Sequence, residues 1–252
     1  MKSTVAFLTG VYAVTWILCL VLRPAAEQGG LTTLLAWLLP TVWAPTLLAL
    51  VIALLSTGMA GVKEELGRLR VGRGFGRWMF IAMVVPPLIT AIAVWSGRAV
   101  GDAAPLIPSS AILMMVIFQL ITGALGEELG WRGFLLPRLG TRMGATAAAW
   151  LMAVLWSAWH IPAFFFPGTP QHALIPPVPF LMFIALFGFC LAFLFRRAGG
   201  SILPTIVAHL ALNVSLGAGG VQLSSPTFWW AMVGMSAICA LLATRAGVSP
   251  DA

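Results

Sequence analysis

Two glutamates, Glu127 and Glu128, stand side by side at the end of an apolar run that starts near Ala111. The chain has only seven acidic residues among 252. A carboxylate in or beside hydrocarbon costs about 2.5–3.5 kcal/mol on insertion scales, so such a residue usually serves a function. The alternative is that the pair marks the hydrated end of a helix. This stretch alone fits both interpretations.

Helical spacing gives the two carboxylates different surroundings. Successive residues advance by about 100° around a helix, so Glu128 and Arg132, four apart, share a face and can pair. Glu127 points about 100° away from Glu128 and is not tied to Arg132 by this geometry. We therefore interpret Glu128 and Arg132 as a buried structural ion pair, and Glu127 as a freer carboxylate that can meet water and substrate.

Two further polar pairs lie on later apolar runs. Trp156 and His160 are four residues apart, as are His209 and Asn213, so each pair shares one helix face. A single His on an apolar helix is more often a hydrogen-bonded core residue, and Asn with His can also join two helices. However, two of the three histidines lie inside apolar runs, like the acidic pair. The third, His172, lies in a Pro-rich segment, and we assign it no role.

One Glu, two His and one Asn suit hydrolysis by an activated water. A carboxylate and an imidazole can together deprotonate water, which contributes about 10²–10⁴-fold in rate. The remaining His and Asn can donate hydrogen bonds to the oxyanion that forms when a carbonyl is attacked. Glu127, His160 and His209 also have the residue types of a zinc site. Because there is no His-Glu-x-x-His, that alternative rests on residue types alone.

The composition indicates an integral membrane protein. Hydrophobic residues make up 60% of the chain and charged residues 8%, whereas soluble domains have about 25% charged residues. At about 20 residues per span, we expect an all-α polytopic protein with about eight transmembrane helices. Residues 1–252 then form a single membrane domain, with the motifs within 126–213. The formal net charge of +7 reflects basic cytoplasmic loops rather than a nucleic-acid partner.

The apolar runs predict the order and orientation of the spans. They cover residues 5–22, 31–55, 78–95, 109–128, 145–166, 178–195, 201–216 and 227–244. Eight spans place both termini on one side, which carries twelve of the fourteen Lys and Arg residues; Arg23 and Arg98 lie on the other. Basic loops stay in the cytoplasm, so we expect both termini there. These spans place Glu127 near the cytoplasmic end and His160 near the exterior end, so long, tilted helices are needed for the two to meet.

A second acidic pair precedes the third span. Glu64-Glu65-Leu66-Gly67 repeats the letters of Glu127-Glu128-Leu129-Gly130. It lacks an Arg at the matching offset and lies in a polar segment. We therefore interpret the repeat as chance.

Three motifs in this order carry a family resemblance: Glu-Glu-x-x-x-Arg, aromatic-x-x-x-His and His-x-x-x-Asn, each on its own span. Together they resemble the CPBP (Abi) family, which comprises type II CAAX prenyl proteases and bacteriocin-processing or self-immunity proteins. The basic Leu-Gly-Arg-Leu-Arg stretch before the third span is also similar to that family. The resemblance implies an intramembrane endopeptidase, built as a conical or cavity-containing bundle whose site opens to the cytoplasm.

The resemblance also implies roles for the motif residues. Glu127 and His160 would activate the water, and His209 and Asn213 would form the oxyanion site. Members of the family are often labelled metalloproteases, but a metal-independent glutamate mechanism is also argued for them. We expect no cofactor here, with zinc held by Glu127, His160 and His209 as the alternative.

The resemblance leaves three supporting residues. Glu128 and Arg132 would stabilise the site as a pair. Trp156 stands where the family usually has Phe, and we expect it to keep an aromatic wall and to change pocket size more than chemistry.

Two other classes of function were weighed against a protease. A non-catalytic immunity or scaffold protein of the same fold would bind a peptide or partner. A transporter would show inverted internal repeats, which the sequence lacks. For a protease, prenylated CAAX ends, leader peptides and membrane anchors all fit as peptide or protein substrates at the lipid bilayer. The Ala-, Gly- and Arg-rich composition favours a bacterial cell membrane.

Overall fold

The structure, a computed structural model, describes residues 2–72 and 74–247 of the chain. Within these residues, seven helices are long and apolar enough to cross a membrane. Five of them are continuous α-helices: α1 (Lys2–Ala26), α2 (Leu31–Thr57), α4 (Phe75–Ala99), α10 (Pro177–Arg197) and α12 (Pro226–Arg245). The seventh expected span, residues 201–216, forms the shorter apolar helix α11 (Leu203–Gly217). The protein is therefore an all-α polytopic membrane protein, as the composition predicts.

The remaining two spans are composite helices. Residues Ser109–Met143 form one helical run of 35 residues. Its parts are a 3-10 turn η1 (Ser109–Ala111), α5 (Ile112–Gln119), a π segment η2 (Leu120–Ala124), α6 (Leu125–Glu128), a second π segment η3 (Leu129–Leu135) and α7 (Leu136–Met143). Helix α8 (Ala145–Trp159) continues after His160 as a 3-10 turn, η4 (Ile161–Phe165).

The prediction that the fourth span ends at Glu128 is wrong. The helical run continues for another fifteen residues, to Met143, and bends at Thr122, whose φ and ψ are −94° and 17°. Glu127 therefore lies near the middle of the run and not at its end, which removes the difference in depth from His160. The run continues because Glu128 and Arg132 neutralise each other within it, so neither charge forces the chain to water. Single π turns inside α-helices are frequent at functional sites.

Close contact with α2 also holds this run in place. A Cβ atom at Gly130 would lie 2.4 Å from the backbone of Pro45, and one at Gly126 would lie 2.8 Å from the Val42 carbonyl oxygen. Any larger residue at either position would push the two helices apart. Pro40 and Pro45 remain inside α2, as expected for prolines whose freed carbonyls meet neighbouring helices.

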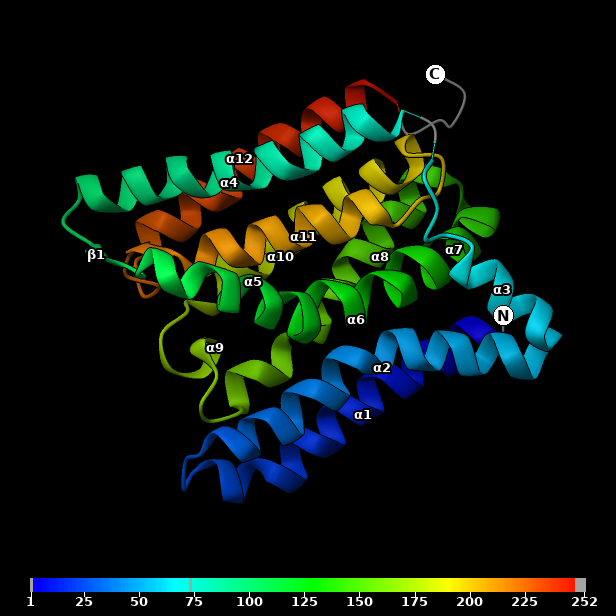
Figure 1. Ribbon diagram of the computed structural model, residues 1–252, viewed down its shortest axis with the longest axis horizontal. Helices are drawn as coiled ribbons and strands as arrows, with labels where there is room; N and C mark the ends of the chain where they lie inside the picture. The colour runs from blue at the N-terminus through cyan, green and yellow to red at the C-terminus, as the bar shows by residue number, and fades with distance from the viewer. Residues whose placement is uncertain (1, 73, 248–252) are drawn as a thin grey trace.

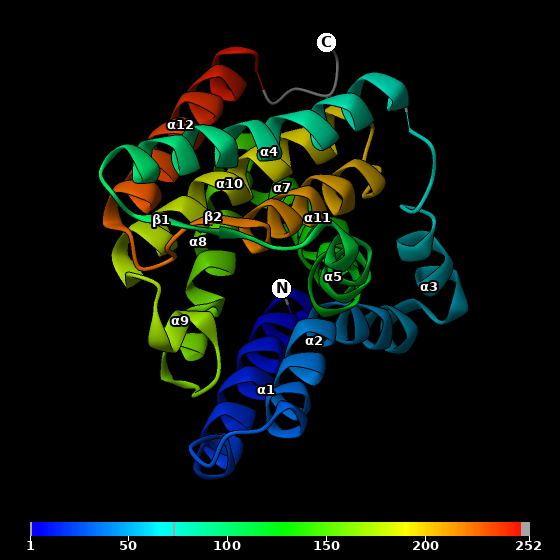
Figure 2. The same ribbon diagram turned by 60° about the vertical axis from the view of Figure 1, so that its left-hand side comes forward.

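Successive helices run in opposite directions, and both termini lie at the same end of the bundle (Figure 1). We call this end the terminal face; it also carries α3 (Met59–Leu66) and α7. The opposite end, the loop face, carries the α1–α2 connection and α9 (Pro170–Ala173). It also carries a two-stranded antiparallel sheet of β1 (Ala103–Leu106) and β2 (Gly219–Val221), seen edge to edge in Figure 2. This sheet joins the segment before α5 to the segment after α11.

Bulky side chains fill the half of the bundle near the terminal face. Trp131, Phe134 and Leu135 are fully buried there. Phe7 on α1 lies edge-on to Trp131, with ring centroids 5.7 Å apart, and 5.2 Å from Phe134. This half is therefore packed like a protein core.

Glu65 of the second acidic pair is a buried structural residue, whereas Glu64 is exposed. Glu65 is 1% exposed and bridges two arginines, Arg68 at 3.2 Å and Arg138 at 2.8 Å. Arg138 belongs to α7, so Glu65 joins α3 to the end of the long helical run.

Candidate active site

The expected ion pair of Glu128 and Arg132 is present and carries a third partner. Arg132 Nη1 donates to Glu128 Oε1 over 2.8 Å, and neither side chain is exposed. The same oxygen accepts from His209 Nδ1 at 2.9 Å. Glu128 thus holds a residue 81 positions away, on α11, and fixes the direction of its ring.

Glu127 has a different environment from its neighbour. Its side chain is buried and lies at the end of a cavity, where Oε2 accepts a hydrogen bond of 2.8 Å from Trp156 Nε1. No ion pair of Glu127 occurs among the described residues. The separation of roles expected from the 100° offset is therefore present: Glu128 is ion-paired, and Glu127 is held by a neutral donor.

Trp156 is the centre of the site, and the sequence interpretation of it as a wall was incomplete. Besides bonding Glu127, its ring lies under the Arg132 guanidinium, 4.1 Å from the ring centroid. The rings of His160 and His209 meet it edge-on at 5.1 and 5.4 Å. The resembling family usually has Phe at this position. Because Phe has no N–H group, Trp156 adds a hydrogen bond to Glu127 that Phe could not form.

His160 has one nitrogen fixed by the backbone of its own helix. Its Nδ1 lies 2.8 Å from the Trp156 carbonyl oxygen, which can only accept. Nδ1 therefore carries the proton, and in the neutral ring Nε2 keeps its lone pair. His160 is half-buried and lines the same cavity as Glu127. The ring can thus accept a hydrogen bond from a water between the two.

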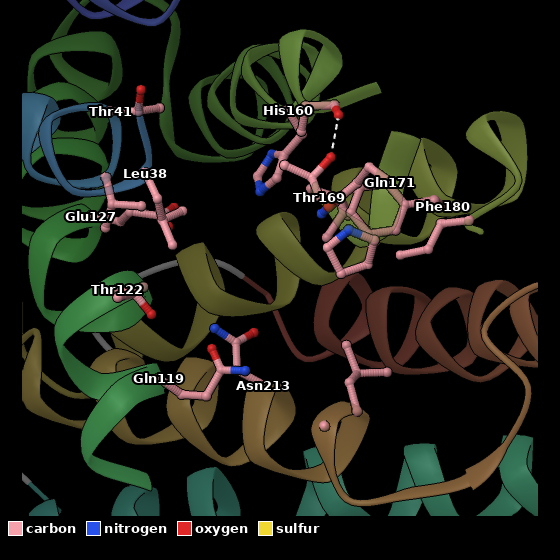
Figure 3. Close-up of a pocket in the computed structure, with 18 of the residues that line it drawn as sticks. Leu38, Thr41, Gln119, Thr122, Glu127, His160, Thr169, Gln171, Phe180 and Asn213 are labelled. Carbon is pink, nitrogen blue, oxygen red and sulfur yellow. Dashed lines mark hydrogen bonds between the residues drawn. The ribbon is translucent and has the colours of Figure 1, made fainter. Parts of the chain in front are cut away.

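Asn213 lies one helical turn beyond His209 on α11 and also reaches the cavity. Gly123 allows this approach, since a Cβ atom there would lie 2.8 Å from Asn213 Nδ2. Figure 3 shows Glu127, His160 and Asn213 projecting into one space from three different elements. The fold therefore brings all four predicted catalytic residues, including His209, to one cavity.

The cavity has a volume of about 480 Å³ and a mostly apolar wall with several neutral polar groups. Sequence reasoning missed those groups, which include Thr41, Gln119, Thr122, Thr169 and Gln171. Gln119 could have been found only as a polar residue within an apolar run, because it lies eight residues before Glu127 and so about 80° away around an ideal helix. Thr41, Thr169 and Gln171 could not, since they come from other elements.

The residues of the site do not form a group suited to a metal ion. Over the described ranges 2–72 and 74–247, no three His, Cys, Asp or Glu side chains come together as potential ligands. His209 uses Nδ1 to bind Glu128, and Glu127 is bonded to Trp156. His209 Nδ1 and one oxygen of Glu127 thus already have protein partners, and zinc held by Glu127, His160 and His209 stays the alternative prediction.

A chelator tests metal independence directly. Dialysis of the purified protein against a strong chelator is expected to leave both the rate of peptide cleavage and the melting temperature unchanged. The reason is that the described residues contain no cluster of potential metal ligands. The measurement is cleavage before and after treatment, with elemental analysis of the protein. Activity that disappears on chelation and returns with stoichiometric zinc would assign the three residues to a metal instead.

Trp156→Phe isolates the hydrogen bond to Glu127. The variant keeps a ring beside Arg132 but loses the N–H group. Hydrogen bonds to charged groups contribute about 1.5–3 kcal/mol, so we expect kcat to fall about 10- to 100-fold with little change in KM. Trp159→Phe is the matched control, because it loses an indole bond of 2.7 Å to Thr15 instead. Equal losses of kcat in the two variants would assign Trp156 a packing role only.

Two comparisons with known proteins match the part of the chain that contains the site. Residues 108–215 match the family described as Rce1-like type II CAAX prenyl endopeptidases. A CAAX prenyl protease 2 from Methanococcus maripaludis is 29% identical over 105 residues, which cover 40% of this chain and 39% of that protein. The chain thus aligns with about two fifths of the length of this relative. Both matches agree with the family that the three motifs resemble.

Proposed function

We propose, from the premise that residues 108–215 belong to the Rce1-like family of type II CAAX prenyl endopeptidases, that this protein is an intramembrane endopeptidase. It hydrolyses a peptide bond of a membrane-associated protein or peptide. The environment of Glu127 carries the proposal beyond the family. Glu127 forms no ion pair among the described residues, and Trp156 bonds only one of its two carboxylate oxygens. It also lines the same cavity as His160. A carboxylate so placed can act on water.

In the proposed reaction, a water lies between Glu127 and His160. Glu127 accepts a proton as the water oxygen attacks the carbonyl carbon of the scissile bond, while the lone pair of His160 Nε2 orients the water. The tetrahedral intermediate then breaks its C–N bond, and the proton passes to the departing nitrogen. The products are a carboxylic acid and an amine, which exchange one proton to become a carboxylate and an ammonium group, so protons and electrons balance without a cofactor.

The developing oxyanion would be stabilised by Asn213 and His209. Asn213 Nδ2 offers an N–H group from the opposite wall. His209 would contribute through Nε2, because its Nδ1 is already bonded to Glu128.

Asn213→Ala tests the oxyanion assignment. Loss of one oxyanion donor typically lowers kcat by about 10²–10³-fold, so activity should be reduced but measurable. Gln119→Ala removes another amide from the same cavity, one that lies beside Asn213 in Figure 3. We expect it to affect kcat much less. Steady-state kinetics on one peptide would decide, and a larger loss with Gln119→Ala would transfer the role to that residue.

The proposed activity is tested most directly by a search for the cleaved bond. Membrane peptides would be compared by mass spectrometry in cells that contain the wild-type protein and in cells that contain His160→Ala at the same abundance. We expect at least one peptide to be cut only in the wild-type sample and to be cut again by the purified protein in vesicles. Identical peptides in both samples, with both proteins folded, would favour a protein that binds without cleaving.

A further inference from the structure

The cavity that contains Glu127 lies entirely in one half of the bundle. On α2 its lining residues run from Leu34 to Val42, within the half of that helix that begins at the loop face. On α11 they run from His209 to Gly217, at the end that reaches the same face. The connections of the loop face contribute Gly168, which is exposed, and Gln171, which is half-buried. The cavity therefore opens at the loop face.

The other half of the bundle offers no comparable path. On the side of Glu127 toward the terminal face, the next turns of the same run hold Trp131, Arg132 and Phe134, all without exposure. Beyond them, Glu65 is bridged to Arg68 and Arg138. Water and peptide can thus reach Glu127 from the loop face, whereas packed side chains separate it from the terminal face.

The positive charges of the protein lie at the terminal face. Within the described residues this end carries Lys2, Lys63, Arg68, Arg70, Arg77, Arg138, Arg142, Arg196, Arg197 and Arg245, all at or beyond helix ends. The loop face carries Arg23 and Arg98. Because Lys and Arg near the ends of spans are retained in the cytoplasm, this distribution places the terminal face in the cytoplasm.

Two expectations from the sequence are therefore incompatible in this fold. Both termini were expected in the cytoplasm from the Lys and Arg residues, and the site was expected to open to the cytoplasm from the family resemblance. The site opens at the face opposite the termini, so only one of these can hold. A ratio of ten basic residues to two is strong, whereas the resemblance covers only the motifs.

We propose that the catalytic cavity opens to the extracytoplasmic side of the membrane and takes an uncharged, extended peptide segment from that side. The inference rests on the proposed protease function. The cavity wall supports the class of substrate: among the described residues that line it, Glu127 is the one carboxylate and there is no Lys or Arg. Thr41, Gln119, Thr169 and Gln171 can bond a peptide backbone, and the apolar wall can accept apolar side chains. Neither Lys nor Arg among these described lining residues is placed to hold a terminal carboxylate.

Cysteine labelling from each side of the membrane tests the opening. In a background with Cys19, Cys190 and Cys239 replaced by Ala, single cysteines are placed at Gln171, at the mouth of the cavity, and at Thr122, inside it near Glu127 (Figure 3). Lys63→Cys, exposed on α3, is the matched control for the terminal face. A small, charged, membrane-impermeant thiol reagent is applied to intact cells and to inside-out vesicles.

We expect Gln171→Cys and Thr122→Cys to react in intact cells, and Lys63→Cys to react only in inside-out vesicles. Labelling of Gln171→Cys only in inside-out vesicles would reverse the orientation and overturn the proposal. If Gln171→Cys reacts from outside but Thr122→Cys does not, the cavity does not open to the extracytoplasmic side, and the proposal is overturned. Trypsin gives a second measurement on the unaltered protein, since cleavage after Arg70 or Arg77 should require inside-out vesicles. Labelling does not depend on catalysis. A protein that shows the expected labelling but cleaves no peptide would therefore refute the protease function and leave the side of the opening unaffected.

Discussion

Glu127→Gln is expected to abolish peptide cleavage while the protein remains folded. Gln keeps the shape of Glu and can still accept the Trp156 hydrogen bond, but its amide cannot take a proton from water. The loss should therefore fall on kcat and leave substrate binding nearly unchanged. General-base assistance alone contributes about 10²–10⁴-fold, so the remaining rate should be close to background. Single-turnover cleavage and a peptide-binding measurement on the same preparation would separate the two effects.

Glu65→Gln is the matched control for this variant. Glu65 is also buried, at 1% exposure, but it bridges Arg68 and Arg138 far from the cavity. We expect the opposite result: a lower melting temperature with kcat retained in the protein that stays folded. Substantial turnover by well-folded Glu127→Gln would show that the base is another group.

Glu128→Ala and Arg132→Ala are expected to cause the largest losses of stability. Each leaves its partner charged in a fully buried place, and loss of one member of a buried pair costs about 3–5 kcal/mol. Arg132 also has two donors, Nε and Nη2, without a hydrogen-bond partner among the described residues. Its remaining stabilisation comes from the Trp156 ring and from Glu128. Unfolding in detergent, followed by heat or denaturant, would measure the effect.

An exposed pair with the same spacing provides the control. Arg23 and Glu27 are also four residues apart and 3.2 Å from each other, but their side chains are 46% and 58% exposed. Surface pairs contribute about 0–1 kcal/mol, so Arg23→Ala should melt almost like the wild type. If Arg132→Ala behaves like Arg23→Ala, the Glu128–Arg132 pair does not stabilise the fold.

Local pattern was enough to predict the class of the protein and the residues of the site. Hydrophobic residues at 60% and runs of about 20 residues allow only membrane-spanning helices. The spacing of Glu128 and Arg132 fixed their pairing, because residues four apart on a helix are always neighbours. The order of the three motifs indicated the family, and residues 108–215 match the model of Rce1-like type II CAAX prenyl endopeptidases. The catalytic roles of Glu127, His160, His209 and Asn213 remain predictions.

Contacts between distant residues could not be predicted, because spacing along one helix says nothing of which neighbour it faces. Trp156 reaches Glu127 across 29 residues, and His209 reaches Glu128 across 81. The long helical run passes beyond Glu128 since its charges are neutralised inside the bundle, which depends on packing against α2. The ion pairs of Glu65 could not be predicted for the same reason, because its second arginine, Arg138, lies 73 residues away in sequence.

The side to which the site opens is the clearest case of a property that only the tertiary structure decided. The sequence determined where the positive charges lie, because Lys and Arg are counted loop by loop. The sequence did not determine where the cavity lies. A cavity is space that side chains leave unfilled between packed helices, and here side chains fill one half of the bundle and leave space in the other. Trp131 and Phe134 close the half near the termini, whereas Gly123 leaves room beside Asn213 in the other.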